Sequence, residues 1–149
     1  MRKALFYRML WAVMFCVGSS VAQADQTITN EIIALVKSEW AAEQNRNIVE
    51  KIKNTADDYT EFNDFAPTRV DGKTVAARLE EAGWKDSKVY VATEMLNPKV
   101  QVYGDTAILT YNFAGFRRNK DGKLDPDNAK VTRVYVKQAG KWMLVHAHF

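Results

Sequence analysis

The chain closes with Val131-Thr-Arg-Val-Tyr-Val-Lys137 and Gly140-Lys-Trp-Met-Leu-Val-His-Ala-His-Phe149, two segments in which apolar and polar residues alternate. A short turn that contains Gly140 joins them. Alternation with a period of two is typical of a strand with one buried face, and a glycine-containing turn between two such segments favours a β-hairpin. The chain is therefore predicted to end in an antiparallel hairpin that carries an arginine, a tryptophan and a His-x-His pair.

Two further segments with strand-like alternation precede this hairpin. The first spans Lys88–Tyr103 and is interrupted by Asn97-Pro98. Because proline cannot donate a ladder hydrogen bond, we expect a bulge or bend there. Gly104-Asp105 turns the chain into the second segment, Thr106–Phe116, and a polar connection from Asn119 to Asn128 leads on to the hairpin.

The first half of the chain has the three- and four-residue apolar spacing of helices. It predicts a long amphipathic helix over Thr29–Gln44, a short helix over Ile48–Asn54 and a short strand over Asp58–Asn63. A third helix is predicted over Lys73–Ala82, with Asp71 as its N-cap and Gly83 at its end.

Helices followed by antiparallel strands predict an α+β fold. A sheet with one apolar face must bury that face, and the helices are the elements available to cover it. We therefore expect a cone-shaped, curved antiparallel sheet wrapped round the long N-terminal helix, with two further helices and a cavity between the layers.

The N-terminus has the features of a cleavable signal peptide. Arg2, Lys3 and Arg8 form a basic segment, Met9–Val17 is apolar, and Val21-Ala-Gln-Ala24 offers small residues for cleavage after Ala24. The apolar run is too short for a membrane-spanning helix, which needs about 20 residues. We expect residues 1–24 to be a leader, residues 25–149 to form a single domain, and the protein to be periplasmic or secreted.

Removal of the leader changes the charge balance. The chain has 21 Lys+Arg and 18 Asp+Glu, and three basic but no acidic residues lie in the first 24, which leaves 18 of each. A balanced charge provides no concentrated cationic face, so neither nucleic acid nor, after cleavage, a membrane is predicted as a partner. The single cysteine, Cys16, lies in the leader, so no disulfide is expected.

Residues in the second half of the chain resemble a known family. The matching residues are Asn97-Pro98-Lys99-Val100, Gly104-Asp-Thr-Ala107, Tyr111, Asp121-Gly122, Thr132-Arg-Val134, Gly140-Lys-Trp142 and Val145-His-x-His148. In order and nearly in spacing they resemble the association (hub) domain of calcium/calmodulin-dependent protein kinase II and its bacterial secreted relatives, within the nuclear transport factor 2-like (SnoaL-like) superfamily. The resemblance covers most of residues 28 to 149. No kinase catalytic domain is predicted, because neither a Gly-rich nucleotide loop nor a His-Arg-Asp catalytic loop is present.

The resemblance implies a pocket inside the cone. If Arg133 faces inward, alternation brings Tyr135 inside with it. The last strand has two alternative registers, Met143, Val145, Ala147 and Phe149 inward or Trp142, Leu144, His146 and His148 inward, and the resemblance favours the first. The expected pocket residues are Arg133, Tyr111, Phe113, Tyr135, Phe149, Trp40 and Phe62.

Such a pocket would be aromatic and apolar with one buried cation, which suits a small organic anion such as a carboxylate with an apolar body. The alternative is a structural ion pair between Arg133 and Glu61 or Glu94, because a buried arginine needs some anion. The resemblance also implies further basic positions, which Ala76, Phe113 and Phe149 occupy here. A less anionic ligand is therefore expected.

The favoured register leaves a large patch on the outer sheet face, and patches of that kind usually meet a partner. The expected oligomer-interface residues are Trp142, Leu144, His146 and His148. We expect self-association into a homodimer or a higher ring. The two histidines have a metal-compatible spacing, but no cysteine, third histidine or obviously placed carboxylate completes a site, so neither a metal nor another cofactor is predicted.

Three classes of function remain open from the sequence: a binder of a small organic ligand, an oligomeric scaffold with a filled pocket, and an isomerase or cyclase. An enzyme of this fold would use a carboxylate beside a tyrosine. No catalytic motif assigns a catalytic residue. The candidates by location are the acids Asp57, Asp58, Glu61 and Glu94 and the hydrogen-bond donors Tyr59 and Tyr111.

Overall fold

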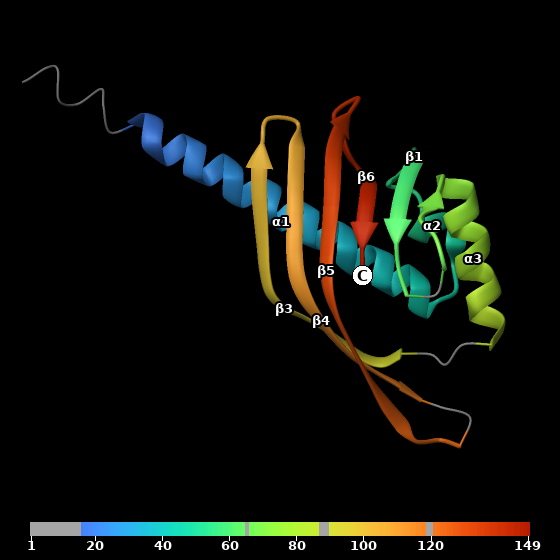
Figure 1. The fold of residues 1–149 in the computed structure, drawn as a ribbon. Helices are drawn as coiled ribbons and strands as arrows, with labels where there is room; N and C mark the ends of the chain where they lie inside the picture. Colours follow the sequence, from blue (N-terminus) through green and yellow to red (C-terminus); the bar gives the residue numbers. More distant parts are fainter. Residues whose placement is uncertain (1–15, 65, 87–89, 119–120) are drawn as a thin grey trace, which may run out of the picture.

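The computed structural model describes residues 16–64, 66–86, 90–118 and 121–149. Within these residues lie three helices and six strands, helices mostly first and strands last (Figure 1). In chain order they are α1 (Cys16–Gln44), α2 (Ile48–Lys51), β1 (Thr55–Phe62), β2 (Val70–Asp71), α3 (Lys73–Asp86), β3 (Tyr90–Tyr103), β4 (Thr106–Arg118), β5 (Leu124–Gln138) and β6 (Lys141–His148). The predicted α+β fold class is confirmed.

The strands form one curved sheet in the order β2-β1-β6-β5-β4-β3. Neighbouring strands are antiparallel, except that β1 runs parallel to β6. The chain reverses through tight turns between β3 and β4 and between β5 and β6, where Gly104 and Gly140 have positive φ angles of 60° and 81°. Positive φ is a conformation that glycine adopts without steric cost, which explains these turn residues.

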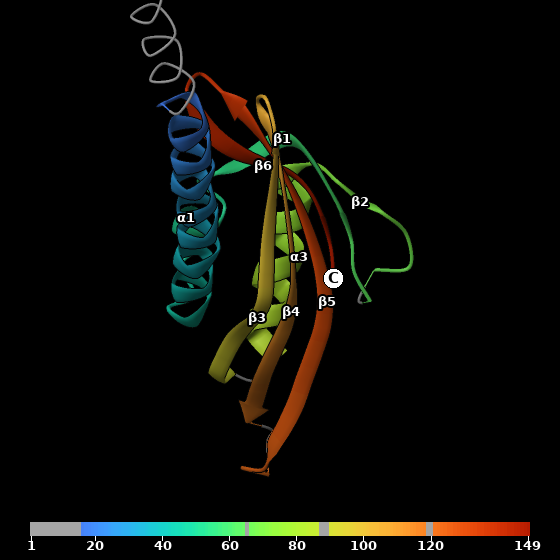
Figure 2. The same cartoon turned by 90° about the vertical axis from the view of Figure 1, so that its left-hand side faces the viewer.

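The long helix α1 crosses one face of the sheet, as the view along the sheet edge shows (Figure 2). Ile32 and Val36 of α1 are fully buried against Leu109 of β4 and Tyr135 of β5. The two other helices pack at the β1 end, where half-buried Lys51 of α2 forms ion pairs with Glu43 of α1 and Glu80 of α3 at 2.8 and 2.7 Å. The other members of the core are Tyr59, Ala107, Tyr111, Val131, Trp142, Leu144 and Ala147.

The three helices begin or end at other residues than the sequence predicted. The long helix already begins at Cys16 and so runs through the predicted cleavage region. Whether the leader is removed stays a prediction, since residues 1–15 lie outside the described part of the chain. The second helix ends at Lys51 rather than Asn54 because Thr55 already begins β1. The third helix continues through Gly83 to Asp86.

No described helix is both long enough and apolar enough to span a bilayer.

The predicted polar connection from Asn119 to Asn128 is wrong over its second part, because β5 begins at Leu124. These residues pair with β4 as far as Arg118, so ladder hydrogen bonds stabilise a strand that lacks apolar alternation. Asp127 fixes this extension by accepting hydrogen bonds from Tyr90 and Arg117. The expected irregularity at Asn97-Pro98 is confirmed by a register shift between Leu96 and Lys99.

Another β-bulge, which the sequence did not indicate, lies in β6. Tyr135 pairs with Leu144, but the preceding residue on β5, Val134, pairs with His146, so Val145 is an extra residue. A one-residue insertion reverses which face the following side chains occupy. Trp142 and Leu144 therefore face the core before the bulge, and Ala147 faces it afterwards.

Candidate functional site

Arg133 lies in the centre of the inner sheet face and is 5% exposed. Its Nη1 donates a hydrogen bond to Oε2 of Glu39, which is 6% exposed on α1. Burial alone would lower the pKa of Arg133, but the adjacent carboxylate outweighs it and holds the pKa well above the usual value. The guanidinium is thus neutralised by a carboxylate of the chain itself.

The structural ion pair that the sequence allowed for Arg133 is confirmed, but both partners named for it are wrong. Glu61 hydrogen bonds elsewhere, Glu94 is exposed, and the actual partner is Glu39. A signal for Glu39 was present, since it follows Ile32 by seven residues and Val36 by three. That spacing places it on the apolar stripe of the helix, where a charged residue needs a buried partner.

Three tyrosines surround the ion pair: Tyr59 of β1, Tyr111 of β4 and Tyr135 of β5. Burial raises the pKa of all three hydroxyls, although the nearby Arg133 opposes this. Three polar atoms of the cluster are buried without a hydrogen-bond partner in the structure: Glu39 Oε1, Arg133 Nε and the Tyr135 hydroxyl.

An aromatic row continues from this cluster toward the β3 edge. The ring of Trp40 meets Tyr111 edge-on at a centroid distance of 6.0 Å and Phe113 at 5.5 Å. Tyr90 meets the other side of Phe113 at 5.4 Å. The structure therefore brings together Arg133, Tyr111, Phe113, Tyr135 and Trp40, five of the seven residues expected to line a pocket.

The remaining two behave differently. Phe149 lies with its ring centroid 5.4 Å from the guanidinium carbon of Arg133, as the prediction of an inward Phe149 requires, but its side chain is 39% exposed. Phe62 does not face the interior. Tyr59 and Glu61 of β1 occupy the inner face, so alternation turns Phe62 outward, where it is 44% exposed.

The outer face, meaning the sheet side opposite α1, carries Phe62 together with two of the predicted interface residues. The Phe62 ring packs against His146 at 6.0 Å and His148 at 5.7 Å. Thr60 Oγ1 hydrogen bonds to His146 Nδ1 at 2.8 Å. The predicted outward positions of Trp142 and Leu144 are wrong, because these side chains are 2% and 4% exposed in the core and the bulge separates them from the histidines.

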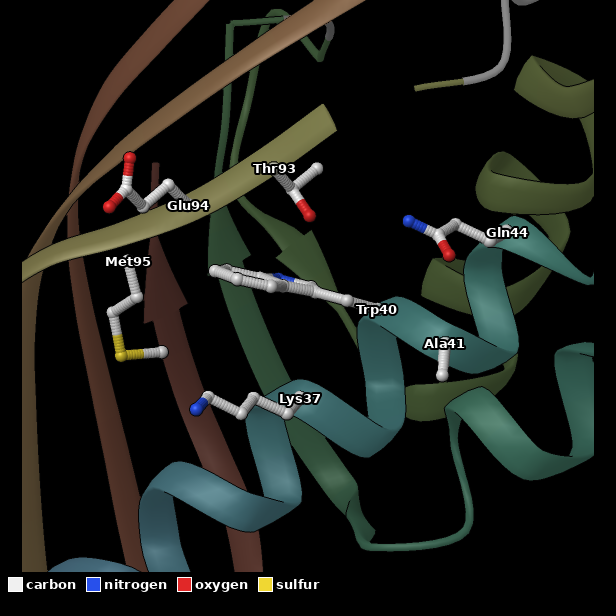
Figure 3. A pocket seen from close by; sticks show the side chains of 7 residues that line it. All are labelled: Lys37, Trp40, Ala41, Gln44, Thr93, Glu94 and Met95. Carbon is white, nitrogen blue, oxygen red and sulfur yellow. The ribbon is translucent and has the colours of Figure 1, made fainter. Parts of the chain in front are cut away.

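A groove of about 450 Å³, lined in part by Trp40, opens between α1 and β3 (Figure 3). We call it the α1–β3 groove. Trp40 extends across its centre and Lys37 reaches along α1, whereas the side chain of Glu94 on β3 points away from Trp40. Its lining residues are Lys37, Trp40, Ala41, Gln44, Thr93, Glu94 and Met95.

Of the acid–tyrosine pairs considered for catalysis, one comes together. The Tyr59 hydroxyl donates a hydrogen bond to Glu61 Oε2 at 2.8 Å, and the side-chain amide of Asn63 also donates to Glu61. Asp57 and Asp58 are exposed. Among the described residues, no group of three histidine, cysteine, aspartate or glutamate side chains could hold a metal ion.

Solved structures share this fold. The association domain of calcium/calmodulin-dependent protein kinase II from C. elegans superposes with a TM-score of 0.72 at 20% identity, covering 84% of this chain and 96% of that chain. An NTF2-like protein of unknown function from Pseudomonas putida KT2440 has a TM-score of 0.72 at 22% identity, covering 83% and 85%. The calcium/calmodulin-dependent protein kinase II hub homology domain from Chlamydomonas reinhardtii has a TM-score of 0.69 at 22% identity, covering 81% and 95%.

No curated protein sequence matches the chain significantly. The family of the calcium/calmodulin dependent protein kinase II association domain, in contrast, matches residues 28–149, which is most of the chain. The matched range begins near the middle of α1 and contains the whole sheet. The chain therefore belongs to the calcium/calmodulin-dependent protein kinase II association domain family.

Proposed function

We propose that this protein is an exported, self-associating module and that copies associate through the outer face of the sheet. The observation that carries the proposal is an apolar row across the centre of that face. Ile108 of β4 pairs with Val134 of β5, and Val136 of β5 pairs with Met143 of β6. All four side chains are partly exposed in the single chain. Phe62 and His146 extend the row toward β1.

Apolar side chains next to one another on an exposed sheet face gain little while they stay in water. Burial of apolar surface contributes roughly 25 cal/mol per Å², so a second copy on this face would remove a cost that the single chain retains. A two-fold axis is the simplest arrangement, because one self-complementary face then closes the assembly. The association and hub domains named among the relatives support self-association in particular.

The inner face supports the same conclusion by a different argument. An organic anion in the cone would need a cation, and Arg133 is already paired with Glu39 and buried. Bringing a second carboxylate beside Glu39 would add like-charge repulsion in a poorly solvated interior. The interior is thus better suited to holding α1 against the sheet than to capturing a free carboxylate.

The test is the subunit count of the chain as purified from cells that express the full sequence, by native mass spectrometry and light scattering. The sequence of the purified N-terminus also tests export, which should leave Asp25 as the first residue. The interface variant is Val134→Asp, since in a two-fold interface one substitution introduces two charges. The matched control is Val49→Asp on α2, where the valine is 71% exposed and far from the sheet face.

We expect an oligomer for the parent chain and for Val49→Asp, and dissociation at least about tenfold easier for Val134→Asp, because a buried unpaired charge is costly. Met143→Lys replaces it should Val134→Asp fail to fold by circular dichroism. A monomeric parent chain would refute the proposal. So would an oligomer that both outer-face variants leave intact.

A further inference from the structure

Both histidines of the chain lie on the outer face of the sheet. The sequence contains two, and they stand two residues apart on β6, as His146 and His148. His146 pairs with Val134, which belongs to the apolar row of the proposed interface. Its ring also meets the Phe62 ring edge-on, at an interplanar angle of 75°. Histidine is the side chain that ordinarily changes its charge between pH 8 and 5, so this face carries the residues most sensitive to pH near neutrality.

His146 is fixed in place by a neighbouring strand. Its Nδ1 lies 2.8 Å from Oγ1 of Thr60 on β1. A threonine hydroxyl can donate a hydrogen bond to a neutral imidazole and accept one from a charged imidazole, so this contact holds the ring in either state. The ring is also partly exposed in the single chain, where water solvates both states. The single chain therefore tolerates His146 with or without its charge.

No charge on this face is positioned to neutralise a protonated His146. Among the residues that the structure describes, no carboxylate forms an ion pair with it. The charged and titratable side chains on the strands around it are all exposed to water, which screens them: Asp58 of β1, Asp71 of β2 with its partner Arg69, Lys130 of β5 and His148 of β6. Asp71 is already engaged by Arg69 at 2.7 Å.

Association through the outer face would distinguish the two states of His146. A second copy would remove water from Val134 and from the histidine that pairs with it. A neutral imidazole loses little in such a place, whereas a charged one loses its hydration and gains no counter-charge. A two-fold axis doubles the cost, because each copy contributes its own His146.

We propose that protonation of His146 controls self-association, so that copies associate while this histidine is neutral and separate when it is charged. The inference rests on the proposed outer-face association and adds its regulation by pH. The associated state binds fewer protons than the separate chains, so a falling pH shifts the equilibrium toward separate chains.

The size of the effect follows from the number of histidines. An ordinary histidine is about 10% charged at pH 7.5 and about 90% charged at pH 5.5, so the requirement for a neutral side chain costs about tenfold in affinity over this range. Two copies of His146 should therefore raise the dissociation constant of a dimer about 100-fold. Carboxylates stay almost fully charged between these pH values and contribute little to the change.

The experiment is analytical ultracentrifugation of a dilution series of the untagged chain at pH 7.5 and 5.5, at one ionic strength. His146→Gln removes the titrating group, and its dissociation constant should agree within about twofold at the two pH values. His146→Phe also removes it but keeps a ring beside Phe62, and it replaces His146→Gln should that variant fail to fold by circular dichroism. The matched control is His148→Gln, an exposed histidine on the same face of the same strand, which should keep the 100-fold change.

Three results would overturn control by His146 while the oligomer at pH 7.5 remains. They are a parent chain with equal dissociation constants at both pH values, a parent chain that associates more tightly at pH 5.5, and a pH dependence that survives in the His146 variants or disappears in His148→Gln. A parent chain that is monomeric at pH 7.5 gives a different result, because it refutes the proposed self-association and its regulation together.

Discussion

Removing one partner of the Glu39–Arg133 ion pair should destabilise the fold far more than removing both. Arg133→Met leaves a buried carboxylate without its cation, and Glu39→Leu leaves a buried guanidinium without its anion. Because both residues are at most 6% exposed, water cannot compensate for the lost partner. Breaking a buried pair in this way usually costs about 3–5 kcal/mol, whereas replacing both charges by apolar residues of similar volume is often neutral or stabilising.

The structure also predicts which of the three variants loses the most stability. Glu39 Oε1 already has no hydrogen-bond partner, so Arg133→Met leaves both carboxylate oxygens without a protein partner. Arg133 keeps the aromatic ring of Phe149 over its guanidinium in Glu39→Leu. We therefore expect Arg133→Met to be the more damaging single variant and the double variant Glu39→Leu/Arg133→Met to lie within about 1 kcal/mol of the parent chain.

The assay is urea unfolding followed by circular dichroism at one fixed protein concentration, because an oligomer is stabilised by its own concentration. The coupling energy follows from the four free energies of unfolding in a double-mutant cycle. A coupling of several kcal/mol is expected, unchanged by added salt, since buried charges are screened little. Additive effects, with the double variant losing the sum of the single losses, would refute the conclusion that the charges neutralise each other.

Two further predictions concern glycine and lysine positions in the fold. Gly115→Ala should destabilise the chain by about 1–3 kcal/mol in urea unfolding, since the added Cβ would lie 2.9 Å from the Phe113 ring. Gly83→Ala in α3 should instead stabilise the chain by about 0.5–1 kcal/mol, because its added Cβ meets no atom within 4 Å. A Gly83 variant as damaged as the Gly115 variant would contradict this. Burial lowers the pKa of Lys51, but its two glutamate partners outweigh burial and raise the pKa above 10.5. The stability difference between the parent chain and Lys51→Met should therefore be constant from pH 7 to 9 and should shrink as the pH rises past 10.5. A difference that persists unchanged at pH 11.5 would contradict a raised pKa for Lys51.

Periodicity predicted the fold because it reports which face of each element is buried. The spacing of Ile32 and Val36 located the long helix, and alternation in the closing hairpin located β5 and β6. The bulge at Val145 was beyond this kind of argument. One extra residue leaves the composition of β6 unchanged, yet it puts Trp142 and Leu144 in the core and His146 on the outer face.

The site was predictable only where alternation sufficed. Arg133, Tyr135 and Tyr111 were correctly placed inside because their neighbours alternate regularly. Glu39 was missed because an acidic residue on a helix is usually solvated, and only its position in the apolar stripe indicated otherwise. The groove was also missed, since it depends on how α1 crosses β3, and no local pattern fixes that crossing.

Self-association through the outer face can be tested in a single set of melting curves. If copies associate through the outer face, the melting temperature must rise with protein concentration, because only the folded chain has that face. Val134→Asp should abolish this dependence, and Val49→Asp should retain it. A concentration dependence that Val134→Asp leaves unchanged would mean that copies associate through another surface.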